Sequence, residues 1–291
     1  MKRFLPLLAA CLFLAPTLAA AQVKIGVINS MTGPQAPIGE NLTNGIKLAE
    51  EDLAAKGIKV QLVWEDDTGK PQVGLSAMDK LATRDNVAGV VGAYTSAVTN
   101  AVAKKAEQYK MPLVNPVASK EEITRQGYKY VFRVSATTGD YASILLDMAT
   151  TLGKPKTIAI LSENTDFGVS GAKSAREYAD KKGIKVVFEE AYSPGSPDYR
   201  STLVKVKGAN PDLMFMISYV ADAITLMRQS RELQLTPMAF LGAGAGFSTD
   251  KFASEKNISH AVFSSTQWTP DVSWPGSKAF AATSPMIIME M

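Results

Sequence analysis

Short apolar runs alternate with amphipathic stretches along most of this 291-residue chain. Ten runs have the length of a strand, and several of them are nearly continuous in Val, Ile, Leu and Met. Such runs are typical of parallel strands that are covered on both faces. The predicted strands are 23–28, 59–64, 87–92, 112–115, 131–135, 157–162, 185–191, 213–218, 238–242 and 261–264.

The stretches between these runs have the apolar spacing of helices. In the first of them Leu42, Ile46, Ala49 and Leu53 follow one another at intervals of three or four residues, which places them on one helical face. The predicted helices are 39–56, 71–84, 98–109, 140–152, 167–182, 199–207 and 221–233. Strands and helices in steady alternation predict an α/β fold with parallel sheets.

The segment 135–139 is small and polar, and it separates two series of about five strand–helix units. This pattern predicts two Rossmann-like lobes joined by a hinge, with a cleft between them. In open α/β sheets ligands bind beyond the carboxyl ends of the strands, so two lobes that face each other there enclose a pocket. The predicted division is a signal peptide at 1–21, an N-terminal lobe I at 22–137, a lobe II at 138–265 and an incomplete return towards lobe I at 266–291.

The first residues have the order of a secretory leader. Met1-Lys2-Arg3 gives a positive start, an apolar run follows, and three alanines precede Gln22. We therefore expect residues 1–21 to be cleaved and the protein to be periplasmic. The alternative is a lipoprotein with its lipid on Cys11, and it is disfavoured because only residues 4–7 would then form the apolar core of the leader.

Composition argues against several other classes of protein. The formal charge is +3 and falls when Lys2 and Arg3 leave with the leader, whereas a nucleic-acid partner requires a dense basic face. Cys11 is the only cysteine and His260 the only histidine, which leaves no thiol nucleophile after cleavage and no usual zinc arrangement. The glycine-rich segment 242–246 misses the third glycine of a dinucleotide motif. We expect no cofactor, no metal, no nucleic acid and no catalysed reaction.

Segments spread over most of the chain share the sequence patterns of one known family. They are Met31-Thr32-Gly33-Pro34, Val90 to Ser96, Met111 to Ser119, Tyr130-Val131-Phe132-Arg133, Asp166-Phe167-Gly168 and Ser196-Pro197-Asp198-Tyr199. In collinear order they cover about residues 23–270. On these segments the chain resembles the branched-chain amino-acid (leucine/isoleucine/valine) binding family of type I periplasmic binding proteins, the solute-binding components of ABC importers.

The resemblance implies a ligand pocket with two walls. Ser96 and the loop 117–119 would hold the ligand carboxylate with hydroxyl and amide donors, although Ser96 and Ser119 are also suited to capping the helices that follow them. Across the cleft, Phe167 would pack against the apolar part of the ligand and Tyr219 would add a hydroxyl. The predicted ligand-binding residues are Ser96, Val117, Ala118, Ser119, Phe167, Tyr219, Ile38, Tyr94 and Gly244.

Two departures from the family change the expectation. Gly244 stands where amino-acid binders carry the acid that pairs with the ligand ammonium, and burying an unpaired ammonium is costly. Asp140 or Asp222 is left open as a substitute, and otherwise the ligand is a carboxylate with a sizeable apolar or aromatic part and no α-amine. The second departure is that residues 285–291 do not resemble the family's continuation of the first lobe, so we expect a truncated C-terminal part and exposed apolar surface on that lobe.

The family implies a function in transport. The protein would capture an amino acid or a related small carboxylate in the periplasm and present it to an ABC permease in the inner membrane. The alternative is a periplasmic ligand sensor for a membrane receptor. A secreted enzyme on the same scaffold is a third reading, and the absence of a nucleophile–base pair argues against it.

Overall fold

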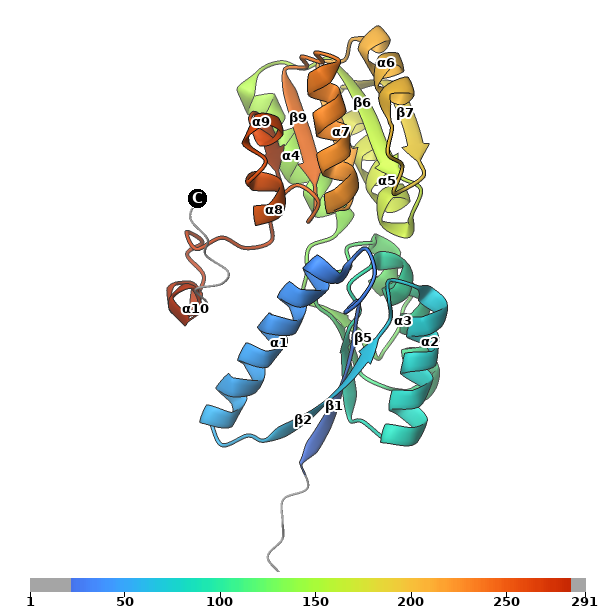
Figure 1. Ribbon diagram of the computed structural model, residues 1–291, viewed down its shortest axis with the longest axis vertical. Helices are drawn as coiled ribbons and strands as arrows, with labels where there is room; N and C mark the ends of the chain where they lie inside the picture. Colours follow the sequence, from blue (N-terminus) through green and yellow to red (C-terminus); the bar gives the residue numbers. More distant parts are fainter. Residues whose placement is uncertain (1–21, 284–291) are drawn as a thin grey trace, which may run out of the picture.

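The computed structural model describes residues 22–283, in which two parallel sheets with helices on both faces stand end to end (Figure 1). The predicted signal peptide, 1–21, lies outside the described residues, as does 284–291. The chain passes from the first sheet to the second through residues 134–137, so the predicted two-lobe α/β fold is confirmed. The exact bounds of the lobes stay a prediction. Among residues 22–283, no helix combines the length and the apolar character that crossing a membrane requires.

The first lobe contains a five-stranded sheet in the order β2-β1-β3-β4-β5. Its strands are β1 (Val23–Asn29), β2 (Val60–Asp66), β3 (Gly89–Gly92), β4 (Leu113–Asn115) and β5 (Val131–Arg133). Its helices are α1 (Ala36–Ala55), α2 (Pro71–Lys80), which a π turn at Leu81–Asp85 continues, α3 (Ser96–Tyr109) and a 3₁₀ turn at Glu121–Thr124.

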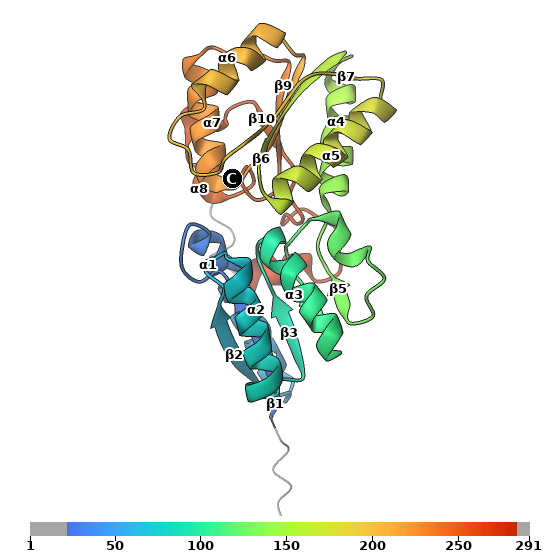
Figure 2. The ribbon, with the colours of Figure 1, turned by 90° about the vertical axis from the view of Figure 1, so that its right-hand side faces the viewer.

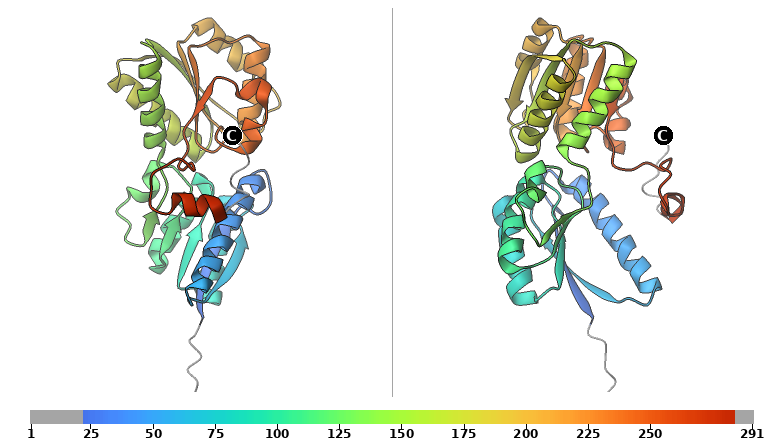
Figure 3. Two further views of the ribbon diagram at one scale, coloured as in Figure 1. Left: turned by 90° about the vertical axis from the view of Figure 1, so that its left-hand side faces the viewer. Right: turned by 180° about the vertical axis from the view of Figure 1, so that it is seen from behind.

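The second lobe repeats the same topology, because its sheet order is β10-β9-β8-β6-β7. Its strands are β6 (Thr157–Glu163), β7 (Lys185–Tyr192), β8 (Leu213–Ile217), β9 (Ala239–Ala243) and β10 (Val262–Ser264). Its helices are α4 (Thr138–Leu152), α5 (Asp166–Lys181), α6 (Arg200–Ala209), α7 (Val220–Glu232), α8 (Asp250–Ala253) and α9 (Lys256–Ser259). A last helix, α10 (Ser277–Thr283), lies at the level of the first lobe (Figures 1 and 3).

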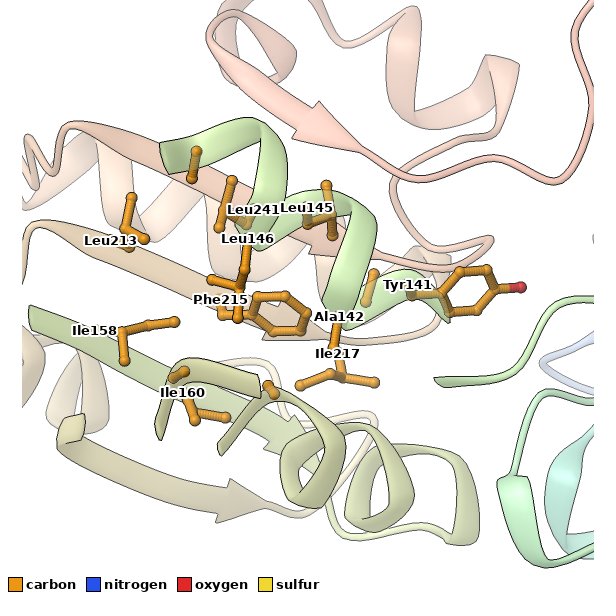
Figure 4. Close-up of a cluster of buried hydrophobic side chains, with 14 of the residues drawn as sticks. Tyr141, Ala142, Leu145, Leu146, Ile158, Ile160, Leu213, Phe215, Ile217 and Leu241 are labelled. Carbon is orange, nitrogen blue, oxygen red and sulfur yellow. The ribbon is translucent and has the colours of Figure 1, made fainter. Parts of the chain in front are cut away.

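The core of the second lobe explains why its strands are continuous apolar runs. Both faces of β8 are buried: Phe215 and Ile217 pack under α4 and α5, while Met214 and Met216 pack under α6 and α7. Figure 4 shows Phe215 in the middle of the first of these clusters. Tyr141 closes the cluster at its cleft end and turns its hydroxyl away from it (Figure 4).

The first sheet is covered less completely. On the face opposite the α2–α3 core, the register places Val27, Val91, Val114 and Phe132 side by side. Val27 is fully buried, whereas Phe132 is 51% exposed and Val134, two residues further on, is 73% exposed. Apolar surface is therefore open at the β5 edge of the first lobe.

The strand order places the functional loops. In each sheet the order reverses between two neighbouring strands, β1 and β3 in the first lobe and β6 and β8 in the second. Loops diverge at such a switch point and leave a crevice beyond the carboxyl ends of the strands. The strand arrows of both lobes point towards the boundary between them (Figures 1 and 2), so the two crevices face each other.

Candidate ligand-binding cleft

A cavity of about 230 Å³ lies at the boundary between the two lobes. The first lobe contributes the turn that leads from β3 into α3 and the loop after β4. The second lobe contributes the first turn of α5, the residue before α7 and the loop after β9. Of the predicted ligand-binding residues, those that line the cavity are Tyr94, Ser96, Val117, Ala118, Ser119, Phe167, Tyr219 and Gly244.

Ser96 does not cap α3. The N-cap is Thr95, whose hydroxyl accepts the Val98 N–H at 3.3 Å. The Ser96 hydroxyl oxygen instead accepts the Lys120 N–H at 3.2 Å, which joins the two loops of the first-lobe wall. Ser119 caps no helix either, because the following 3₁₀ turn begins after Lys120 and has no side-chain cap. The Ser96 hydroxyl proton therefore stays available to a ligand.

The aromatic residues form a continuous wall. The Tyr219 ring lies 5.3 Å from the Phe167 ring and 5.7 Å from the Tyr94 ring, measured between centroids. The Tyr94 side chain is 97% buried, yet its hydroxyl has no hydrogen-bond partner among the described residues. Burial raises the pKa of Tyr94 well above its ordinary value. Tyr94 therefore stays protonated, and its buried hydroxyl has no acceptor among the described residues.

The polar groups of the cleft favour an anion. Ser96 is the first residue of α3, Phe167 belongs to the first turn of α5 and Tyr219 precedes α7, so three helix N-termini meet at the cavity. Helix N-termini carry partial positive charge and unpaired N–H groups. The cavity lining within the described chain contains no Asp, Glu, Lys or Arg.

The two acids left open as ammonium partners have other roles. Asp140 forms a capping box with Thr137 at the start of α4. Asp222 accepts the Tyr199 hydroxyl at 2.8 Å and the Gly195 N–H at 3.0 Å. Neither lines the cavity, so the structure offers no carboxylate in place of the acid that Gly244 lacks.

Gly244 is required for geometric reasons. Its φ of +78° lies in the region that side chains disfavour, and a Cβ atom there would come within 2.9 Å of the Phe167 ring. The glycine thus lets the β9 loop pass close to the aromatic wall. An acid at this position would displace Phe167.

Ile38 lies outside this cavity. It lines a separate space of about 260 Å³ between the start of α1 and the start of α7. Tyr219 lines both spaces and separates them. The predicted role of Ile38 beside the ligand therefore has no geometric support at the main cavity.

The sequence interpretation missed several lining residues. Tyr141 and Gln267 meet at the cavity, where the Gln267 amide donates to the Tyr141 hydroxyl at 2.7 Å. One signal for Tyr141 was present, because it follows the Thr137–Asp140 capping box that marks a helix start at the cleft. Gln267 follows the last strand of the second sheet, where strand-end loops are expected to face the ligand. The other residues missed are Ala245, Ser248, Ser265 and Thr266.

A buried acid supports Tyr219 from behind. The Glu163 side chain is fully buried at the end of β6, and its Oε1 accepts the backbone N–H of Tyr219. Burial, together with the nearby Asp222 carboxylate, raises the pKa of Glu163 to about 8. Glu163 is therefore largely protonated at neutral pH.

Polar contacts join the two lobes beside the cavity. Lys120 of the first lobe forms an ion pair with Asp166 at the start of α5, with 2.8 Å between Nζ and Oδ2. The Asn100 amide of α3 donates to the same carboxylate oxygen at 3.1 Å. These contacts hold the lobes together around the cavity.

Comparison with known proteins shows the family of the chain. A family model described as periplasmic binding protein matches residues 22–284. Among curated proteins, Leu/Ile/Val-binding protein homolog 7 of Brucella suis biovar 1 is 28% identical over 298 residues, which cover 96% of this chain and 74% of that protein.

Solved structures share the fold over nearly the whole chain. The substrate-binding protein LivJ of Streptococcus pneumoniae, in complex with isoleucine, has a TM-score of 0.80 and 23% identity and covers 91% of this chain and 77% of its own. A solute-binding protein of an ABC transporter from Rhodopseudomonas palustris BisB5, in complex with 3,4-dihydroxybenzoic acid, has a TM-score of 0.78, 25% identity and coverages of 91% and 74%. The chain therefore belongs to the periplasmic binding protein family, among the type I binding proteins related to the Leu/Ile/Val-binding proteins.

Proposed function

We propose that the protein is the solute-binding component of an ABC importer and that its ligand is a small carboxylate with an aromatic or bulky apolar body and no ammonium group. The observation that carries the proposal is the cavity lining, which contains hydroxyls, amides and aromatic rings but no charged side chain in the described chain. An α-amino acid would bury an ammonium there without a carboxylate partner, at a cost of several kcal/mol.

The two ends of the cavity suit the two ends of such a ligand. Ser96 and the loop 117–119 offer hydroxyl and amide donors for a carboxylate. The Tyr141–Gln267 pair offers hydroxyl and amide groups for a ring substituent, and the Phe167 ring packs against the body. The R. palustris relative that binds 3,4-dihydroxybenzoic acid supports an aromatic acid, and the isoleucine-bound LivJ supports the amino-acid alternative.

In this proposal the protein binds its ligand in the cleft without changing it chemically. The lobes close on the ligand, and a membrane permease receives the closed form. The family consists of substrate-binding proteins, so we assign no catalysed reaction. We also propose a periplasmic location after cleavage of residues 1–21, which N-terminal sequencing of the exported protein would test.

Calorimetric titration of the purified protein with benzoate, 4-hydroxybenzoate and leucine tests the ligand class. We expect binding of at least one aromatic acid that is at least tenfold tighter than binding of leucine. Tight leucine binding without measurable binding of the aromatic acids would overturn the proposal. Mass spectrometry of any co-purified ligand provides an independent check.

A further inference from the structure

A half-buried arginine stands behind the wall of the cleft that carries Ser119. Arg133 is the last residue of β5, and its guanidinium donates into the loop after β4. Nη1 donates to the Ala118 carbonyl and Nη2 to the Lys120 carbonyl, both at 2.5 Å, while Nε donates to the Thr124 hydroxyl at 3.2 Å. Arg133 thus holds the two carbonyls that flank Ser119.

Holding these carbonyls sets the direction of the Ser119 amide. In a trans peptide the N–H of one residue points opposite to the carbonyl of the residue before it. Arg133 and the Asn115 amide, at 2.7 Å, both donate to the Ala118 carbonyl, and neither donor lines the cavity. Ser119 lines the cavity, and within residues 22–283 neither its N–H nor its hydroxyl has a hydrogen-bond partner. Both donors are free for a ligand.

The charge of Arg133 is not neutralised by an ion pair. In the part of the chain that the structure describes, no carboxylate lies within 4 Å of its guanidinium. Glu121 and Asp140 interact with it at longer range, but Glu121 is paired with Arg125 at 2.6 Å and Asp140 accepts hydrogen bonds from Thr137. Burial lowers the pKa of Arg133, yet a guanidinium begins so high that it stays charged. A fixed positive charge therefore lies directly behind the cleft loop.

We propose that Arg133 is the positioning residue of the carboxylate subsite. Its planar fork fixes the loop 117–120 so that the donors of Ser119 face the ligand, and its unpaired charge favours an anion over a neutral ligand of the same shape. This inference rests on the proposed function, because it names the residue that selects the carboxylate within that cleft. Lysine is a poor replacement, since an ammonium is a point charge that cannot hold two carbonyls in one plane.

The first test measures, without any ligand, how strongly Arg133 restrains the loop 117–120. Hydrogen exchange is followed by mass spectrometry on the full chain and on the variants Arg133→Met, Arg133→Lys and Arg125→Met. Arg125 is the matched control because it lies near the same loop but its side chain is 72% exposed and, within residues 22–283, bonds only to Glu121. We expect exchange of the two hydrogen-bonded amides of this loop, Val117 and Lys120, to rise roughly tenfold or more in R133M, with β1 and β3 unchanged, and to stay as in the wild type in R125M.

The second test measures whether Arg133 makes the cleft prefer a negatively charged ligand over a neutral one. Benzoate and its neutral isostere benzamide are titrated into the same proteins. The hydrogen bonds at stake involve charged groups, so we expect R133M to lower the affinity for benzoate roughly tenfold or more and the affinity for benzamide far less. R133K is expected to keep much of the preference for benzoate while its loop exchanges faster than in the wild type.

The outcomes separate this inference from the proposed function. Unchanged loop exchange in R133M, or an equal loss of benzoate and benzamide affinity, would overturn the role of Arg133. A wild-type protein that binds no carboxylate would instead refute the proposed ligand class, and loop exchange would still decide whether Arg133 positions Ser119. If circular dichroism shows that R133M does not fold, R133K decides the exchange test, with wild-type protection of the loop as the contrary result.

Discussion

Two adjacent hydroxyl residues at the start of α3, Thr95 and Ser96, have different roles that the sequence alone did not distinguish. Thr95 caps the helix, and Ser96 faces the cavity while its oxygen accepts the Lys120 N–H. A capping serine and a ligand-binding serine look alike in a sequence, because both are hydroxyls that precede a helix. The structure separates them through their partners.

We expect Ser96→Ala and Thr95→Ala to have different effects. Both should lower the free energy of unfolding by about 1 kcal/mol. S96A loses the acceptor of the Lys120 N–H, and T95A loses the N-cap of α3. Only S96A should also weaken carboxylate binding, by roughly tenfold or more. Urea denaturation and calorimetric titration measure the two effects. Equal affinity losses in the two variants would show that Ser96 has no separate ligand role.

Gly244 allows a second test with a matched control. Gly244→Ala and Gly183→Ala both place a methyl group at positive φ, which costs roughly 1–2 kcal/mol of stability. Around Gly183 nothing lies within 4 Å of the new methyl, whereas at Gly244 the methyl meets the Phe167 ring at 2.9 Å. We expect G244A to be the less stable variant in urea and the only one of the two to lose ligand affinity. Similar behaviour of both variants would mean that Phe167 moves aside without consequence.

The ends of strands and helices place the side chains that lie at and behind the cleft. The carboxyl end of β6 supplies Glu163, and the N-terminal turn of α7 supplies Asp222, so two buried acids meet behind Tyr219. Glu163 keeps its proton in the folded protein up to a pKa of about 8, while in the unfolded chain it loses the proton near its ordinary value of 4.5. The folded state then binds more protons, so this group lowers the stability as pH rises from about 4.5 to 8.

Replacing this acid should flatten the pH dependence of stability. We expect the stability of Glu163→Gln relative to the wild type to rise between pH 4.5 and 8, by about 1.4 kcal/mol for each pH unit in that range. Glu190→Gln is the control with the opposite sign, because its hydrogen bonds to Thr202 and Lys205 lower the pKa of Glu190. Urea denaturation at several pH values measures both. A difference between wild type and E163Q that does not vary with pH would contradict the raised pKa.

In the proposed function, the whole molecule depends on the balance between open and closed lobes. The ion pair of Lys120 with Asp166 crosses the boundary beside the cavity, and both side chains are partly exposed. Pairs of this kind contribute about 0.2–1 kcal/mol. The contribution is small, but in a protein that closes on its ligand it adds directly to the binding free energy.

We expect Asp166→Asn to weaken ligand binding by about twofold to fivefold and to make the affinity less sensitive to salt. The control is Glu232→Gln, which removes an ion pair with Arg200 inside the second lobe and should leave the affinity unchanged. Titration at low and high ionic strength measures the effect, and small-angle scattering reports whether the lobes open. Equal affinities of D166N and the wild type would mean that the pair does not favour closure.

Periodicity alone determined most of the fold. All ten predicted strands and seven of the helices are present within a few residues of their expected bounds, because buried parallel strands and amphipathic helices leave different spacings in the sequence. The short helices α8, α9 and α10 were not predicted, since four to seven residues are too few to show a helical period. The family resemblance identified most of the residues that line the cleft, because its motifs lie in the loops that follow the strands.

Only the tertiary structure decided which polar groups meet. Gln267 reaches Tyr141 across 126 residues of sequence, Glu163 reaches Tyr219 across 56 and Arg133 reaches the Ala118 carbonyl across 15. A hydrogen bond depends on the position of both partners, and local spacing describes only one of them. The sequence therefore determined the two-lobe scaffold and most of the cleft lining. The packing of the lobes determined which hydroxyls are free, which acids are occupied and where the fixed positive charge lies.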